Sequence, residues 1–150
     1  MTDPRPAAKE APEAVREIIR RAGHELRNAL NGIAVNVEVV RSRSGREGSE
    51  KGLTPFAERA LSQVEEASAL TDGILAFTGS VLVAQAEGTL KEVRGHGAGS
   101  QVELMIYGDR TAGIVSDIER LASRVGVVVE QRGQRVILRV LPEGKSHSKD

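Results

Sequence analysis

The residues of this chain best suited to chemistry lie together in one short segment, His24-Glu25-Leu26-Arg27-Asn28-Ala29-Leu30-Asn31-Gly32-Ile33. An imidazole can act as a nucleophile or exchange a proton near neutral pH. At 100° per residue, five positions fall on one helix face: His24, Asn28, Asn31, Val35 and Val39. A lone surface histidine is ordinarily just solvated, so its interpretation depends on what surrounds it.

The segment lies in a long helical pattern that runs from about Pro12 to Ser44. Its apolar residues recur at helical spacing within a stripe about 80° wide: Val15, Ile19, Ala22, Leu26, Leu30, Ile33, Val37 and Val40. Measured from this stripe, His24 points about 165° away, into solvent. The valines at 35 and 39 are then exposed as well, and exposed valines suit a docking surface for another protein.

A second helix is expected after the polar, glycine-containing turn at residues 42–52. Thr54 and Pro55 mark its start as N-cap and first helical residue, and Gly79 and Ser80 mark its end. One side carries Ala57, Leu61, Val64, Ala67 (or Ser68), Thr71 and Leu75, and the apolar face widens at Leu70, Ile74 and Phe77. The two helices form an antiparallel hairpin that leaves part of each apolar stripe uncovered. Two copies forming a four-helix bundle would cover it, which predicts a homodimer.

The residue pattern of the rest of the chain predicts a small α+β unit. Short β-prone pieces at residues 81–84 and 89–94 precede a glycine-rich loop at 95–99. Residues 101–107 predict a strand and residues 111–125 a helix, capped by Asp109 or Thr111 and buried through Ile114, Val115, Ile118, Leu121 and Ala122. Residues 127–130 and 135–141 predict a hairpin of strands. The sequence thus predicts an α+β fold: flexible residues 1–11, a helical hairpin domain at 12–80, a small α+β domain at 81–141 and a flexible tail at 142–150.

Composition narrows the function classes. The 150 residues include 21 Lys+Arg and 21 Asp+Glu, so the net charge is zero. A polyanion such as nucleic acid is therefore not expected as a partner. There is no cysteine, which removes disulfides and thiolate chemistry. With one Tyr, two Phe and no Trp, base-stacking platforms for nucleic acid are not expected. No segment approaches an uninterrupted membrane span, and the polar start is no signal peptide, so a cytoplasmic protein with no membrane partner is expected.

The segment His24-Glu25-Leu26-Arg27-Asn28-x-Leu30-x-x-Ile33 resembles the H-box of sensor histidine kinases, in their dimerisation and histidine-phosphotransfer domain. The resemblance covers the hairpin, about residues 12–80. It implies that His24 is the phosphoacceptor and that Glu25 hydrogen-bonds the other ring nitrogen. Asn28 occupies a position that the family links to orienting a water for dephosphorylating the partner.

The partner implied by the resemblance is a response-regulator receiver domain, which offers an aspartate to His24 and carries the Mg²⁺ itself. This chain is expected to bind no cofactor and no metal. Arg21 and Arg27 lie near enough to soften the charge of a phosphoryl group, or serve as ordinary helix-surface arginines. Asn31, Val35 and Val39 complete the expected docking face.

The part after the hairpin departs from a kinase. Its order of strand, helix, strand, turn and strand resembles the middle of the kinase ATP-binding domain, with residues 111–125 in place of the nucleotide-binding helix. That helix normally supplies a magnesium-binding asparagine, and residues 111–125 contain none; the glycine boxes are missing too. A truncated, degenerate ATPase remnant is therefore expected, as in dimeric histidine phosphotransferases of phosphorelays.

We accordingly expect a phosphotransferase that relays phosphoryl groups in a two-component system, without autokinase activity. Three alternatives stay open. The first is a phosphatase or binding regulator of a response regulator that uses Asn28 and the same face. The second is a structural dimer module in which the H-box is relic surface, and the third is a kinase completed by a partner chain.

Overall fold

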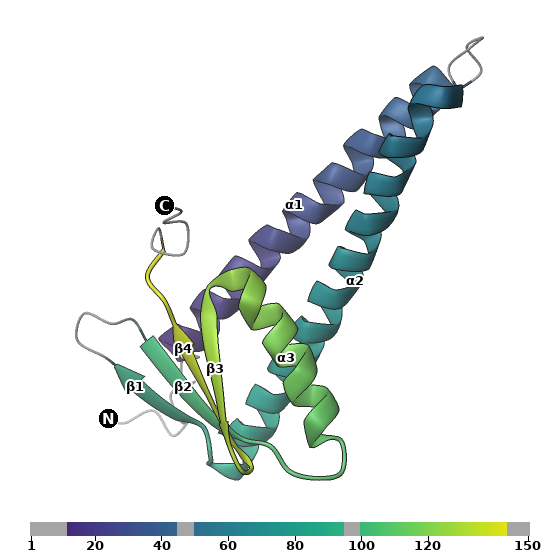
Figure 1. Ribbon diagram of the computed structural model, residues 1–150. Helices are drawn as coiled ribbons and strands as arrows, with labels where there is room; N and C mark the ends of the chain where they lie inside the picture. Colours follow the sequence, from purple (N-terminus) through teal and green to yellow (C-terminus); the bar gives the residue numbers. More distant parts are fainter. Residues whose placement is uncertain (1–11, 45–49, 95–99, 144–150) are drawn as a thin grey trace, which may run out of the picture.

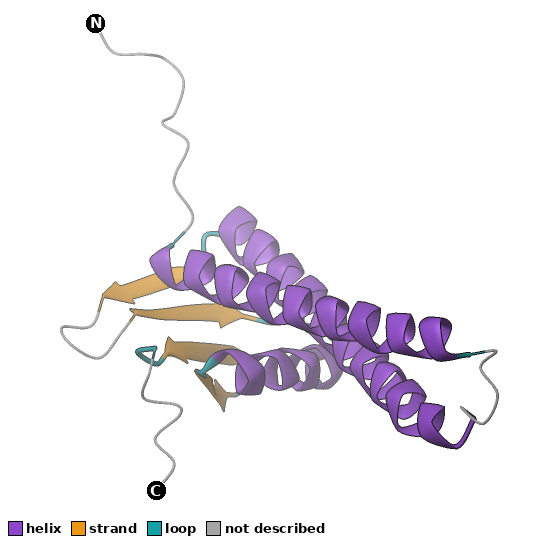
Figure 2. Ribbon diagram, turned by 90° about the horizontal axis from the view of Figure 1, so that it is seen from above, coloured by secondary structure: helices purple, strands orange, loops and turns teal. Residues whose placement is uncertain are grey.

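The computed structural model describes residues 12–44, 50–94 and 100–143. Two long helices extend side by side, and a small sheet with a third helix lies at one end of them (Figure 1). The view from above shows the strands confined to that end (Figure 2). The elements follow in chain order: α1 (Glu13–Arg43), α2 (Glu50–Glu87), β1 (Lys91–Arg94), β2 (Ser100–Met105), α3 (Thr111–Val125), β3 (Val127–Arg132) and β4 (Arg135–Val140). The α+β class and the helical hairpin are therefore confirmed.

The buried side of α1 is rotated from the predicted stripe. Val15 and Ala22 are buried as expected, whereas Ile19, Leu30 and Val37 are exposed. The buried positions also include Ala14, Ile18, Ala29 and Asn36. The first turns of α1 also pack on α3 and the sheet, whereas along the rest of the hairpin α2 covers only one side of a wider apolar face. The remainder of that face is left open along the hairpin.

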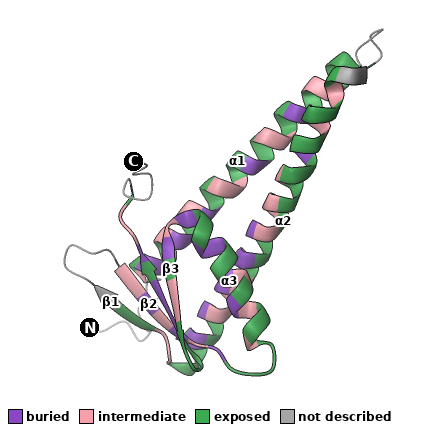
Figure 3. Cartoon of the chain, in the orientation of Figure 1, coloured by how far each residue is buried: buried purple, intermediate pink, exposed green. Residues whose placement is uncertain are grey.

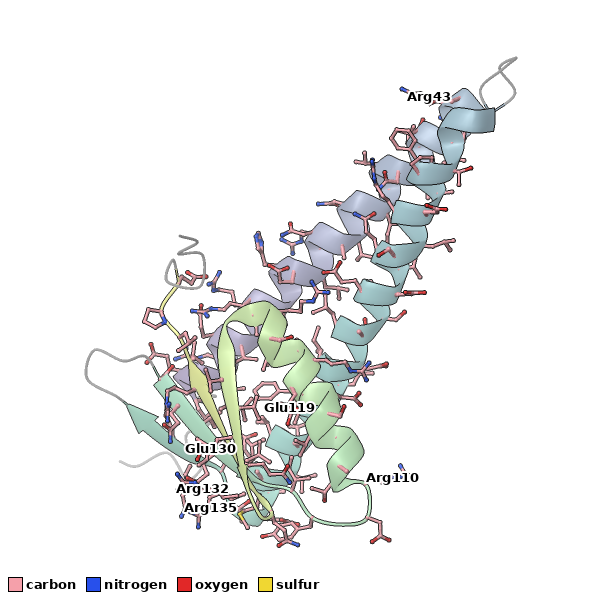
Figure 4. All side chains as sticks on the ribbon, viewed as in Figure 1. Arg43, Arg110, Glu119, Glu130, Arg132 and Arg135 are labelled. Carbon is pink, nitrogen blue, oxygen red and sulfur yellow. The ribbon has the colours of Figure 1, made fainter. Side chains whose placement is uncertain are left out.

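The far end of the hairpin is held by an aromatic contact between the helices. The guanidinium groups of Arg43 on α1 and Arg59 on α2 lie 5.4 Å and 5.3 Å from the centre of the Phe56 ring. Arg43 is labelled at this end, far from the labelled sheet residues (Figure 4). Cation–π contacts of this kind contribute about 0.5–1 kcal/mol at exposed sites.

Helix α2 differs from the prediction at both ends. It begins at Glu50 rather than at Thr54, so that Pro55 lies inside the helix and removes only one backbone donor near the amino end. Gly79 and Ser80 do not end it: the Ser80 hydroxyl donates to the Ala76 carbonyl within the helix. The helix continues to Glu87 and ends at Gly88, whose φ of 73° is left-handed.

Burial explains this extension of α2. Phe77, Val81 and Ala84 recur at helical spacing and are all buried. Covering these side chains outweighs the roughly 1 kcal/mol that an internal glycine costs a helix. Residues 81–84 are therefore helical, and their predicted β structure is wrong. The domain boundary expected at residue 80 falls within a continuous helix.

The sheet is antiparallel, with strand order β1-β2-β4-β3. Burial alternates along β2, and the pairs Val102↔Leu138 and Leu104↔Val136 lie in the core; on β4 Ile137 is buried as well. The strands predicted in this region are thus confirmed. The β3–β4 hairpin turns at Gly133, where φ is 63°. The loop at residues 95–99 lies outside the described residues.

Helix α3 has the predicted bounds and buried side, but not the predicted cap. Arg110 occupies the N-cap position and makes no side-chain cap hydrogen bond. The Thr111 hydroxyl instead donates to the Gly108 carbonyl. The helix ends at Gly126, which is left-handed at φ 69° and suits the C-cap position.

One hydrophobic core joins the base of the hairpin, α3 and the sheet. It combines Ile18 of α1, Phe77 of α2, Leu121 of α3 and the inward residues of β2 and β4. Buried residues gather where the helices meet the sheet, and the far half of the hairpin is mostly exposed or intermediate (Figure 3). The small α+β unit therefore shares its core with the hairpin.

Helix α2 is the one described helix long and apolar enough to cross a membrane by length and composition. This differs from the expectation that no segment approaches a span. Only 33% of its apolar window is buried within the chain, and core helices of water-soluble proteins pass the same test. The finding is a weak indication of a membrane span.

Candidate functional site

The imidazole of His24 lies on an exposed face of α1, the direction predicted from the sequence. Asn28 and Asn31 on the next turns are exposed too, and Val35 is 63% exposed. Val39 is half-buried rather than exposed, so it contributes less to this face than expected. We call His24, Asn28, Asn31 and Val35 the histidine face.

Helix α1 presents three distinct faces. The first packs on α2 through Ala22, Ala29 and Asn36, which are spaced by seven residues. The second is apolar and mostly uncovered: Leu26, Leu30, Ile33 and Val37. At 100° per residue, His24 lies about 120° from Leu30 and about 140° from Ala29. The histidine face therefore stays accessible even when both other faces are covered.

The uncovered apolar face continues across to α2. Leu26, Leu30 and Ile33 line a shallow groove of about 400 Å³ together with five residues of α2: Val64, Ala67, Ser68, Thr71 and Asp72. Along α2 the exposed leucines 61, 75 and 82 keep seven-residue or fourteen-residue spacings. A repeat of seven is the spacing of a seam between packed helices. We call this surface the bundle face.

Arg21 is engaged inside the chain rather than at the histidine face. Its guanidinium donates to the carbonyls of Val125 and Leu141, each at 2.9 Å, and to Glu17 at 2.9 Å. Its side chain is only 12% exposed. The Val125 carbonyl belongs to the last turn of α3, where backbone acceptors lack helical partners. Arg21 thus fastens α3 and the end of β4 to α1, and it is left out of the proposed docking face.

Arg20 has a different environment, although it is adjacent to Arg21. Its guanidinium donates to Glu17 at 2.6 Å and to Glu143, beyond β4, at 2.5 Å. Its side chain is 55% exposed. Arg20 precedes His24 by four residues, so the two lie one above the other on the helix surface.

Glu17 lies between these two arginines. The hydrogen bond from Arg20 lowers the pKa of Glu17 to about 2, with a further lowering by the hydrogen bond from Arg21 and an opposing rise from partial burial. The carboxylate is therefore ionised at neutral pH. It holds both guanidinium groups in place.

Glu25 and Arg27 flank His24 without binding it. The Cβ of Glu25 lies about 100° around the helix axis from that of His24, on the side toward α2, and the side chain is half-buried. Within the described part of the chain, no hydrogen bond joins Glu25 to the His24 ring. Arg27 is exposed and lies one turn after His24. The tautomer-holding contact implied by the resemblance therefore stays a prediction.

Comparison with known proteins gives no match: no protein-family model, no curated protein and no solved structure matches this chain. The chemistry of the site has to be inferred from its own residues.

Sequence reasoning chose Arg21 and Arg27 beside the histidine and missed Arg20. The available signal was the spacing of four residues, which places Arg20 directly on the turn before His24. What the spacing could not reveal is that Arg21 is used by the carbonyls of Val125 and Leu141, which are more than 100 residues away in the chain.

Proposed function

We propose that this chain is a dimeric histidine phosphotransfer protein that relays phosphoryl groups between receiver-domain aspartates through His24, without autokinase activity. The observation that carries the proposal is the position of the histidine. It stands exposed on a long helix, on a face that neither α2 nor the bundle face uses. In-line transfer between two proteins requires a nucleophile that is both accessible and rigidly held.

The proposed step is simple in its bonds. The lone pair of one ring nitrogen attacks the phosphorus of the receiver's acyl phosphate, forming an N–P bond as the O–P bond breaks. The electron pair returns to the aspartate carboxylate, and the proton on the second ring nitrogen passes to Glu25 or to solvent. The Mg²⁺ bound by the receiver neutralises charge on the moving group. The reverse step passes the phosphoryl group to a second receiver.

The histidine face offers contacts besides the reactive ring. The amides of Asn28 and Asn31 can donate to and accept from a docked protein, and Val35 supplies exposed apolar area. Asn28 follows His24 by one turn on the same face, so a receiver docked over the ring can contact it.

We further propose that two copies pair through the bundle face into a four-helix bundle. Leu30, Leu61 and Leu75 are 53%, 65% and 66% exposed in one chain. An apolar seam of about three heptads, roughly 30 Å of helix, is unusual on a monomer. The second copy is the fitting occupant because the groove already contains the heptad spacing that a matching helix pair needs.

The absence of autokinase activity rests on the sequence. Residues 111–125 form α3, which occupies the place of the nucleotide-binding helix in the resemblance, and they contain no asparagine. Residues 141–150 carry no glycine box of the kind that helps to form the nucleotide site of that family.

The test mixes the purified full chain with a receiver domain phosphorylated by acetyl phosphate carrying a ³²P label. Label should move to His24, and His24→Ala should abolish the transfer while leaving the circular dichroism spectrum unchanged. Asn28→Ala should retain labelling of His24 and separates relay from phosphatase activity. If receiver dephosphorylation survives His24→Ala but not Asn28→Ala, the chain is a phosphatase and the relay proposal is wrong. Incubation with labelled ATP and Mg²⁺ should leave His24 unlabelled.

A further inference from the structure

Two arginines occupy the helical turn that precedes His24. Side chains on a helix lean toward its amino end, so the His24 ring extends over the turn that contains Arg20 and Arg21. Arg27 lies on the following turn, away from that lean. A phosphoryl group on His24 would therefore be placed over residues 20 and 21 rather than over residue 27.

Only one of these arginines is available to such a group. Arg21 is 12% exposed and is engaged by the carbonyls of Val125, Gly126 and Leu141, by Glu17 and, at 3.7 Å, by Glu143. Arg20 is 55% exposed, and its partners are the two carboxylates of Glu17 and Glu143. Glu143 is itself 65% exposed, and Glu17 also keeps its hydrogen bond to Arg21. The Arg20–Glu143 pair is thus more exposed to solvent than the Arg20–Glu17 pair, so a competing anion can reach it more easily.

A phosphoryl group is a stronger partner for a guanidinium than a single exposed carboxylate. It carries a charge of about −2 and three acceptor oxygens, and arginine can bind two of them at once. Neighbouring helical positions four apart have Cβ atoms about 6 Å apart, within the reach of an arginine side chain. The exchange makes and breaks no covalent bond.

We propose that Arg20 is the positioning residue for the phosphoryl group on His24, and that Glu143 competes with this group for the Arg20 guanidinium. The inference rests on the proposed phosphotransfer function. In the resting chain Arg20 holds Glu143 beyond the end of β4. In the phosphorylated chain Arg20 turns to His24, and Glu143 keeps only its longer, 3.7 Å contact with Arg21. The end of the sheet is thereby coupled to the phosphorylation state of the histidine.

The competition makes two substitutions act in opposite directions. Each variant is mixed with the phosphorylated receiver, and the equilibrium ratio of phospho-His24 to phospho-receiver is measured. Arg20→Gln should lower the ratio about fivefold, the value of a good exposed charge pair. Glu143→Gln should raise it about two- to fivefold. Arg16→Gln, an exposed site about 12 Å from His24 along α1, should leave it unchanged.

If the Arg20–Glu143 pair is merely structural, both substitutions should change the ratio of phospho-His24 to phospho-receiver in the same direction. Parallel losses in the two variants, or no change in Arg20→Gln, would overturn the inference. Both charge effects should shrink in 1 M salt, since exposed pairs are screened there.

A chemical readout separates this inference from the relay proposal. Phosphoramidate phosphorylates imidazoles without any receiver, and ³¹P NMR follows the decay of phospho-His24. Arg20→Gln should change the decay rate about threefold or more, and Arg16→Gln should not. If phosphoramidate labels His24 and Arg20 affects the decay but no receiver exchanges label, the relay fails and the Arg20 assignment stands. If receivers exchange label normally with Arg20→Gln, the assignment fails and the relay stands.

Discussion

Gly73 of α2 lies directly against Leu121 of α3. A Cβ atom at position 73 would come within 2.6 Å of the Leu121 Cβ and 2.9 Å of the Asp117 carbonyl oxygen. The two helix backbones can approach this closely only because residue 73 has no side chain. This contact joins the hairpin to α3, and the hydrogen bonds of Arg21 join it to the end of α3 and to Leu141 after β4.

Gly73→Ala should therefore destabilise the protein although alanine favours helices. Neither the Asp117 backbone nor the Leu121 Cβ can move away without displacing α3, and such overpacking costs about 1–3 kcal/mol. The free energy of unfolding from urea titration measures this loss. Gly79→Ala in the same helix is the matched control, because a methyl group at position 79 would meet nothing within 4 Å. That variant should gain up to about 1 kcal/mol; equal effects of the two substitutions would contradict the proposed close packing.

A second glycine makes room for a polar contact inside the hairpin. A Cβ at Gly32 would overlap the side-chain amide of Gln63, whose Oε1 accepts a hydrogen bond from Asn36 Nδ2 at 2.9 Å. Gly32→Ala should cost up to about 1 kcal/mol, because the flexible Gln63 side chain can turn away but then loses its hydrogen bond with Asn36. In a Gln63→Ala background the same substitution should become neutral or stabilising, because only the better helix propensity of alanine remains. A double-mutant cycle of unfolding free energies tests this reversal of sign.

Acid should weaken the joint through Glu17. Because its pKa is lowered to about 2 from an ordinary 4.5, its contribution is fully present above pH 4.5 and is lost as the pH falls toward 2. Glu17→Gln should lower the unfolding free energy by up to about 1 kcal/mol at pH 7. The difference between parent and variant should shrink toward zero near pH 2, as measured by urea titrations across that range. A difference independent of pH would mean that the charge of Glu17 is not what matters.

The bundle face makes a prediction about assembly. Leu61→Asp combined with Leu75→Asp should convert a dimer into a monomer, since each change places a charge in the proposed seam. Light scattering during size-exclusion chromatography measures the mass. Val128→Asp, an apolar-to-acid change on the exposed side of β3, should leave the mass unchanged. A parent protein that elutes as a monomer at high micromolar concentration would contradict the bundle.

Local patterns predicted most of the elements. The long α1, the bounds of α3 and the strands of the sheet follow from apolar spacing and glycine positions, which are short-range signals. The end of α2 could not be predicted this way. Its extension past Gly79 depends on Phe77, Val81 and Ala84 packing against residues of α3 and the sheet, far away in the sequence.

The site was predictable to the same extent. The outward direction of His24 follows from helix geometry alone. The separate roles of Arg20 and Arg21 do not, because they depend on which of two adjacent guanidinium groups meets the carbonyls of α3 and the residues after β4. The expected stripe on α1 mixed two different surfaces, one against α2 and one left open, since periodicity reports apolar residues without saying what covers them.

The 38-residue α2 is one uninterrupted helix that forms half of the hairpin and, in its last turns, packs in the core with the sheet. A recombination or truncation point between the two halves would therefore have to cut this helix and strip the cover from Phe77. In a chimeric protein, the helical hairpin that carries His24 and the sheet must therefore be exchanged together. Chimeras that exchange only one of the two should be insoluble.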